Sequence, residues 1–137
     1  MNDQEMIELL RTARTIAVIG LSAKPDRPAY RVAAYLQKVG YRIIPVRPGG
    51  GSVLGEVAYD SLRSIPADIK VDIVDVFRRA EETPAVAAAA VAIGARAFWL
   101  QSGILNEEAL TTAHTAGLRV TQDLCLMVEH RRLAGSL

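Results

Sequence analysis

Five short apolar runs, each followed by a stretch of helical character, constrain this chain more than any other feature of its sequence. The runs have the length of strands, and most of them are continuously apolar, which is typical of strands buried on both faces of a sheet. Proline and glycine mark the ends of the segments between them, as Pro28 and Gly40 do. We expect strands at Thr15–Ile19, Tyr41–Val46, Val71–Val76, Ala97–Leu100 and Leu118–Thr121.

The segments between the strands predict helices through their caps and their apolar spacing. Asp3, Thr83 and Asn106 are residue types that cap helix N-termini, and glycine commonly ends a helix. The expected helices run from Asp3 to about Ala13, from Pro28 to Gly40, from Thr83 to Gly94, from Asn106 to Gly117 and from Leu124 to Leu133, with a short helical turn at Ser61–Ser64.

Regular alternation of strand and helix predicts an α/β fold with a parallel sheet. Right-handed crossovers then give a Rossmann-like, doubly wound sheet of five strands in the order 3-2-1-4-5, with helices on both faces. A length of 137 residues fits one domain over residues 1–137. Ligands of such sheets bind where the strands end. This nominates the loops Gly20–Arg27, Val46–Gly51, Val76–Arg79, Leu100–Leu105 and Gln122–Cys125.

Composition excludes several classes of partner. The net charge of +1 provides no overall field toward nucleic acid or a membrane surface. The longest apolar run, Ala85–Gly94, is shorter than the roughly 20 residues of a membrane span. Acidic residues interrupt the apolar residues of the N-terminus, and Cys125 is the only cysteine. We therefore expect a cytoplasmic protein with a small-molecule ligand, and with neither nucleic acid nor membrane as a partner.

The loop after the first strand has the character of a phosphate site. A strand, a glycine and a helix that begins at Pro28 place free backbone N–H groups at one point. Only one glycine is present where a dinucleotide fingerprint has three, and two cations are added. The alternative is a polar surface loop, which we favour less. The candidate binding residues are Gly20, Leu21, Ser22, Lys24 and Arg27.

The end of the second strand bears on which nucleotide is bound. NAD enzymes place an acid here to accept hydrogen bonds from the ribose, whereas this chain reads Val46-Arg47-Pro48 and has no acid before Glu56. Arginine attracts a phosphate on the ribose, such as NADP and coenzyme A carry. An exposed arginine before a turn explains Arg47 equally well.

The next two loops offer contacts for the rest of a nucleotide. Phe77 and Arg78 follow the third strand, where an aromatic ring can lie against adenine, although a core role for Phe77 is favoured. The fourth loop supplies uncharged donors from Gln101, Ser102 and Gly103, which suit an amide-rich arm or a turn.

No arrangement of side chains indicates catalysis. Cys125 is the one candidate nucleophile, and neither His114 nor His130 has the spacing of its base. An inert thiol, buried or half-buried, is therefore the preferred interpretation of Cys125. We identify no catalytic residue and no metal site.

Several motifs together resemble the small, stand-alone CoA-binding domain proteins. The resemblance covers nearly the whole chain, and its most specific block is Val71-Asp-Ile-Val-Asp-Val-Phe-Arg-Arg79. This family is similar to the CoA-binding domain of the succinyl-CoA synthetase alpha subunit but lacks its phosphohistidine domain. The other matching segments are Val18–Pro28, Tyr41–Pro48, Trp99–Gly103 and Glu129-His130.

This resemblance implies a ligand, coenzyme A or an acyl-CoA, and a role for each loop. It implies phosphate contacts from Gly20, Ser22 and Arg27, ribose-phosphate contacts from Val46, Arg47 and Pro48, adenine contacts from Phe77 and Arg78, and pantetheine contacts from Gln101, Ser102 and Gly103. Two positions depart from the family pattern, Leu124 where an arginine is common and Ala29 where a serine is common.

The expected function is therefore binding of coenzyme A or an acyl-CoA without catalysis. Two alternatives stay open. One is an NADP-binding oxidoreductase, and the other is a CoA-binding regulatory or ligase subunit that acts with a partner chain. A homodimer also stays open.

Overall fold

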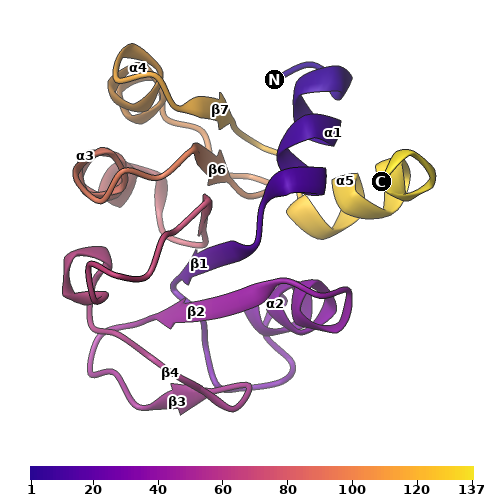
Figure 1. Ribbon diagram of the computed structural model, residues 1–137. Coiled ribbons are helices and arrows are strands. Elements are labelled where there is room, and N and C mark those ends of the chain that lie inside the picture. The colour runs from indigo at the N-terminus through magenta and orange to yellow at the C-terminus, as the bar shows by residue number, and fades with distance from the viewer.

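The computed structural model describes residues 1–137 as a parallel sheet with helices packed on both of its faces (Figure 1). This confirms the Rossmann-like α/β fold that the alternation predicts. The strands of the sheet are β1 (Thr15–Ile19), β2 (Arg42–Val46), β5 (Ile73–Val76), β6 (Ala97–Leu100) and β7 (Arg119–Thr121), and all of their pairings are parallel.

The order of the strands differs in one respect from the expected 3-2-1-4-5. The observed order is β2-β1-β5-β6-β7, so the third of these five strands lies beside the first and not beside the second. The outer edge of β2 is occupied by Tyr59, whose N–H donates to the carbonyl of Pro45 at 2.9 Å and whose carbonyl accepts from Arg47 N–H at 2.9 Å. Strand β5 pairs with the other edge of β1.

This order places the topological switch point between β1 and β5. The chain leaves β1 toward β2 on one side and later returns to pair on the other side of β1. The loops that follow two such neighbouring strands run in opposite directions and leave a crevice at the carboxyl ends of the strands. Ligands of open α/β sheets bind in this crevice. Gly20 and Phe77, which follow the paired residues Ile19 and Val76, lie at this point.

The helices form two layers, one on each face of the sheet. Successive residues of a strand point to opposite faces, so each strand contributes side chains to both layers. Ile16 and Val18 of β1 pack toward α1 (Asp3–Thr12), α2 (Pro28–Lys38) and α5 (Leu126–Leu133). Ala17 and Ile19 pack toward the other layer, which is built from α3 (Thr83–Ala92), α4 (Glu107–Thr115) and the turn η1 (Leu62–Ser64). Figure 1 shows these two layers on opposite sides of the sheet.

Two helix starts differ from the expectation. Asn2, not Asp3, caps α1, because its Oδ1 accepts from Glu5 N–H at 2.8 Å while the Glu5 carboxylate accepts from Asn2 N–H. Thr83 is the first residue of α3 and follows the turn η2 (Ala80–Glu82). Its hydroxyl donates back to the carbonyl of Ala80 at 2.7 Å. The expected cap at Asn106 is confirmed.

A small hairpin after β2 was not anticipated from the sequence. Its strands β3 (Ser52–Val53) and β4 (Glu56–Val57) are antiparallel and joined by Leu54 and Gly55, both with positive φ. A further turn, η3 (Ala134–Ser136), follows α5. None of the helices has the length and apolar character that crossing a membrane requires.

Helix α5 is fixed to α2 through a buried histidine. The Tyr35 hydroxyl lies 2.7 Å from Nδ1 of His130, and the Arg131 guanidinium lies 4.8 Å from the centre of the Tyr35 ring. Burial lowers the pKa of His130, because the charged imidazolium is poorly solvated there. The neutral ring can accept the tyrosine proton at Nδ1, whereas the imidazolium cannot.

We expect stability to fall in mild acid through His130. Its ordinary pKa of 6.5 is lowered in the folded state, so the unfolded state takes up the proton first. The stabilisation is therefore complete above that pH and is lost as the pH falls below it. Urea unfolding at about pH 7.5 and about pH 5.5 should show that the wild type loses more stability than His130→Gln. Parallel pH dependence in the two proteins would contradict this account.

Candidate functional site

The backbone of Gly20 lies directly against the loop that follows β5. Gly20 has a φ of 84°, and a Cβ built on it would lie 2.3 Å from the carbonyl oxygen of Phe77. The same Cβ would lie 3.3 Å from Cδ of Arg78. No side chain fits here, so glycine is required both for the backbone conformation and for the close approach. The two loops of the switch point are thereby held in contact.

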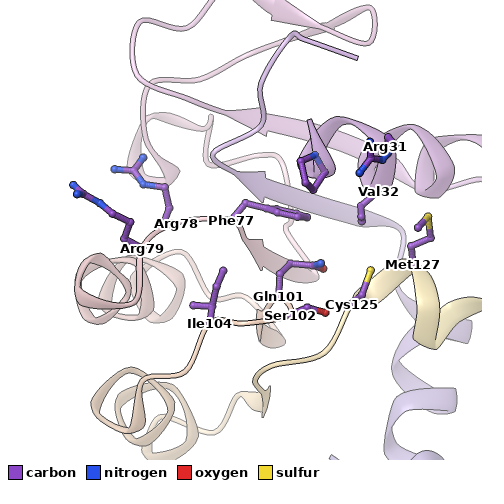
Figure 2. Close-up of a pocket in the computed structure, with 11 residues that line it drawn as sticks. Arg31, Val32, Phe77, Arg78, Arg79, Gln101, Ser102, Ile104, Cys125 and Met127 are labelled. Atoms are coloured by element: carbon purple, nitrogen blue, oxygen red, sulfur yellow. The ribbon is translucent and has the colours of Figure 1, made fainter. Parts of the chain in front are cut away.

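A cavity of about 590 Å³ opens beside this contact. It lies among the start of α2, the loop after β5, the end of β6 and the start of α5 (Figure 2). Its walls combine apolar side chains with guanidinium and amide groups. The lining residues are Pro28, Arg31, Val32, Phe77, Arg78, Arg79, Gln101, Ser102, Ile104, Cys125 and Met127.

Gln101 is the most buried polar side chain in this cavity. It is only 3 % exposed, and its Oε1 accepts a hydrogen bond of 3.0 Å from the N–H of Leu126, the first residue of α5. Gln101 thus caps α5 from the end of β6. Its Nε2 donates to no acceptor in the protein, so this amide can donate to a ligand in the cavity.

The segment Gln122–Cys125 is fastened to the loop after β6. Gly103 N–H donates to Oδ1 of Asp123 at 2.6 Å, and the Trp99 indole donates to the carbonyl of Leu124 at 2.8 Å. Asp123 has a φ of 59°, a conformation that few residues other than glycine adopt. These bonds set the position of Cys125, which is half-buried and faces the cavity.

A second cavity, of about 440 Å³, lies on the α3 side of the same sheet edge. Most of its surface is apolar, and Arg78 lines both cavities. The two cavities therefore meet at Arg78, whose side chain lies next to Gly20. The lining residues are Ile19, Val46, Pro48, Asp60, Ser61, Leu62, Arg78, Glu82, Ala85, Val86 and Ala89.

Arg78 is held at this junction by an acid. Its Nη2 lies 2.8 Å from Oε1 of Glu82, and Nε of Arg79 lies 3.3 Å from the other oxygen of that carboxylate. Hydrogen bonds from Arg78 and then from Arg79 lower the pKa of Glu82, so the carboxylate stays ionised at neutral pH. The pairing positions the guanidinium and leaves some of its N–H donors for another acceptor.

Four further cations of α2 and of the loops after β1 and β2 have no acidic partner. Those that form no ion pair are Lys24, Arg27, Arg31 and Arg47. Arg27 precedes Pro28 of the first cavity, and Arg47 lies between two residues of the second. Unpaired positive charge along this edge favours an anionic ligand.

The structure brings together part of the predicted site. Phe77, Arg78, Gln101 and Ser102 line the first cavity, and Val46, Pro48 and Arg78 line the second, with Gly20 between them. Phe77 also packs on the core, so both of its expected roles coexist. The predicted residues that line neither cavity are Gly20, Leu21, Ser22, Lys24, Arg27, Arg47 and Gly103.

Local contacts explain some of these positions. Leu21 is fully buried in the core, and the Ser22 hydroxyl accepts from Lys24 N–H at 3.1 Å, which stabilises the loop itself. Gly103 N–H is engaged by Asp123. These three residues therefore fix the loops around the site and do not line its cavities.

Several residues that line the cavities were not predicted from the sequence as site residues. Cys125 and Arg79 end two of the nominated loops, so their positions carried a signal, although the thiol was expected to be inert. Asp60 and Ser61 follow the unanticipated hairpin. Arg31 and Met127 belong to helices, and only the packing of α2 and α5 shows that they reach the cavity.

A buried acid lies behind the floor of the first cavity. Asp75 of β5 pairs in register with Trp99, and both residues come two positions before cavity-lining residues, Phe77 and Gln101. Asp75 is fully buried, and neither carboxyl oxygen has a hydrogen-bond partner. Burial therefore raises the pKa of Asp75 well above its ordinary value.

Comparison with known proteins identifies the family. The CoA binding domain family model matches residues 14–131, and the chain belongs to this family. An uncharacterized Bacillus subtilis protein, YneT, is 44% identical over 126 residues, which is 92% of each chain. A Thermus thermophilus structure, cell-free ID.343, is 43% identical with a TM-score of 0.91, covering 97% of this chain and 99% of that one.

A much larger enzyme shares the fold. A dinucleotide-forming acetyl-coenzyme A synthetase of Ca. Korarchaeum cryptofilum aligns with a TM-score of 0.72 and 22% identity. The alignment covers 85% of this chain but only 28% of the synthetase. This likeness shows that the same α/β architecture occurs as one part of a longer chain.

We expect Gly20→Ala to destabilise the fold much more than Gly94→Ala. Both glycines have positive φ, but nothing lies within 4 Å of a Cβ at Gly94, so that variant measures the conformational strain alone, about 1–2 kcal/mol. The clash with Phe77 should add on the order of 2 kcal/mol. Urea unfolding measures both losses, and equal losses would contradict the close contact.

The acid Asp75 should make stability fall as the pH rises. Its folded pKa is raised above the ordinary 3.8, so the folded state binds the proton more tightly. The neutral form is favoured at low pH, and a growing penalty appears above about pH 4. Asp75→Asn lacks this penalty, so its stability relative to the wild type should increase from about pH 4 to about pH 7 in urea unfolding. If the difference in stability between Asp75→Asn and the wild type were the same at both pH values, the pKa of Asp75 would not be raised by folding.

Proposed function

We propose that this chain binds coenzyme A or an acyl-CoA across its two cavities and performs no catalysis of its own. Family membership supports a CoA ligand, and one structural observation supports the mode of binding. That observation is the meeting of two cavities at Arg78, over the glycine that lets two loops touch. A long ligand with a charged centre and two different ends suits this arrangement.

The second cavity suits the adenosine end. The side chains of Val46, Val86 and Ala89 give it apolar walls for a flat ring, and Asp60 and Ser61 add polar groups at its edge. Arg47 is flanked by Val46 and Pro48 of this cavity and has no acidic partner. We assign to Arg47 the phosphate on the ribose, which a guanidinium can bind through two parallel hydrogen bonds.

The junction suits the pyrophosphate. Arg78 lies there beside Gly20, and helix α2 begins at Pro28 with no side chain capping its N-terminus. Uncapped N–H groups at the positive end of a helix dipole stabilise phosphate. Arg79, which follows Arg78 and also lines the first cavity, adds positive charge next to this point.

The first cavity suits the pantetheine arm. The arm carries two amides whose carbonyls need donors, and Nε2 of Gln101 faces the cavity without an acceptor in the protein. Phe77, Val32 and Met127 provide apolar walls for its methylene and methyl groups. A bound arm would accept a hydrogen bond from this amide, which the protein leaves unused.

The two carboxylates that line the cavities, Glu82 and Asp60, are engaged in structural contacts, which supports a binding role. Glu82 pairs with Arg78, and Oδ1 of Asp60 accepts from Gly49 N–H at 2.8 Å. His130 is bonded to Tyr35 on the far part of α5. We therefore assign the site to holding its ligand and not to proton transfer.

Calorimetry with matched ligands and variants tests this proposal. Arg47→Ala should weaken binding of coenzyme A about 10-fold or more, because it removes a charged hydrogen bond to the ribose phosphate. The same variant should bind dephospho-coenzyme A as the wild type does. Arg11→Ala, an exposed cation on α1 outside both cavities, serves as the control. No heat with any CoA species, or tighter binding of NADP, would contradict the proposal.

A further inference from the structure

Cys125 lies at the opposite end of the first cavity from Arg78 and Arg79. Figure 2 shows Arg78 and Arg79 at one end, Phe77 and Gln101 between, and the sulfur of Cys125 turned into the cavity at the other end. The thiol is half-buried, and it is the only cysteine of the chain. A ligand that enters from Arg78 therefore ends beside this sulfur.

The Nε2 group of Gln101 is a second, independent feature of this cavity that can contact a ligand. Gln101 is 3 % exposed, its Oε1 accepts from Leu126 N–H, and its Nε2 has no acceptor in the protein and opens to the same cavity. This N–H₂ group is therefore held in one position and can donate to a ligand that passes it. An amide-bearing arm that satisfies Nε2 continues toward Cys125, which follows from the order of the residues along the cavity.

We propose that Cys125 is a thiol–disulfide exchange site for the sulfur of coenzyme A. The inference rests on the proposed function, because binding of the nucleotide is what delivers the sulfur to Cys125. The protein would hold coenzyme A in two states, a reversibly bound thiol and a mixed disulfide. The co-reactant that forms the second state is a disulfide of coenzyme A.

The exchange step is balanced without a further oxidant. The Cys125 thiolate attacks one sulfur of the CoA disulfide, and a new bond forms between Sγ and that sulfur. The original S–S bond breaks, and its electron pair leaves with the second coenzyme A as a thiolate. That thiolate takes up the proton that Cys125 has lost. Cys125 is oxidised, and the departing coenzyme A is reduced.

The fixed position of Cys125 supports this chemistry. Bonds from Gly103 to Asp123 and from Trp99 to Leu124 hold the segment just before it. A sulfur held on rigid backbone at the end of a binding cavity reacts at a high effective concentration, of about 1 mM for a tethered partner. The selectivity for CoA disulfide then comes from binding and not from the intrinsic reactivity of the thiol.

Intact-protein mass spectrometry on the wild-type chain tests the proposal. Reduced protein is mixed with micromolar CoA disulfide or, separately, with glutathione disulfide at the same concentration. We expect an adduct of one coenzyme A that reductant removes, formed on the order of 100-fold faster than the glutathione adduct. Because the chain has one cysteine, any disulfide adduct is on Cys125.

Two further experiments test whether the exchange reaction depends on binding of the nucleotide. Adenosine 3′,5′-bisphosphate, which has no thiol, should slow the reaction with CoA disulfide and leave that with glutathione disulfide unchanged. Arg47→Ala, which is remote from the sulfur, should have the same selective effect, and Arg11→Ala should have none.

The outcomes separate this inference from the proposed function. If the wild type binds reduced coenzyme A in calorimetry but reacts with the two disulfides at equal rates, the exchange site is refuted and the binding function stands. If it does not bind reduced coenzyme A, both proposals fail.

Discussion

The contact between the backbones of Gly20 and Phe77 is the constraint on which the site depends. A side chain at Gly20 would collide with the Phe77 carbonyl, so the end of β1 and the end of β5 can approach only because glycine stands there. The contact lies at the switch point, where the chain diverges to the two sides of β1. It brings Arg78 to the middle of the sheet edge and leaves one cavity on each side of it.

The second constraint is a pair of hydrogen bonds that link the end of β6 to the start of α5 and to the segment before it. Gln101 supplies the acceptor for the first N–H of α5, and Asp123 supplies one for Gly103. Each of these bonds satisfies a backbone group that would otherwise be unpaired, so the helix start and the loop are fixed together. The same side chain of Gln101 presents its free amide to the cavity. Gln101 therefore serves both the structure and the proposed recognition of the ligand. The buried acid Asp75, which lies behind the floor of the first cavity, lowers the stability of the fold at neutral pH.

The sequence predicted the fold class, the strands and most of the helices, because apolar period and caps are local signals. It did not predict the strand order, since the pairing of Tyr59 on β2 is a non-local contact. Loops at strand ends could be nominated in advance, which located Phe77, Arg78 and Gln101. Helix residues such as Met127 could not be predicted as site residues, because only the packing of α5 on the sheet places them at the cavity. Cys125 was located but interpreted as inert, since one cysteine carries no spacing from which a role can be read.

The central claim is that one coenzyme A molecule spans both cavities and crosses between them at Arg78. A crystal structure of the complex with coenzyme A tests it most directly. The account predicts adenine on the α3 side beside Val86, the pyrophosphate at Gly20 and Arg78, and the sulfur in the cavity that contains Cys125. Adenine and sulfur in the same cavity, or coenzyme A bound away from the ends of β1 and β5, would contradict it.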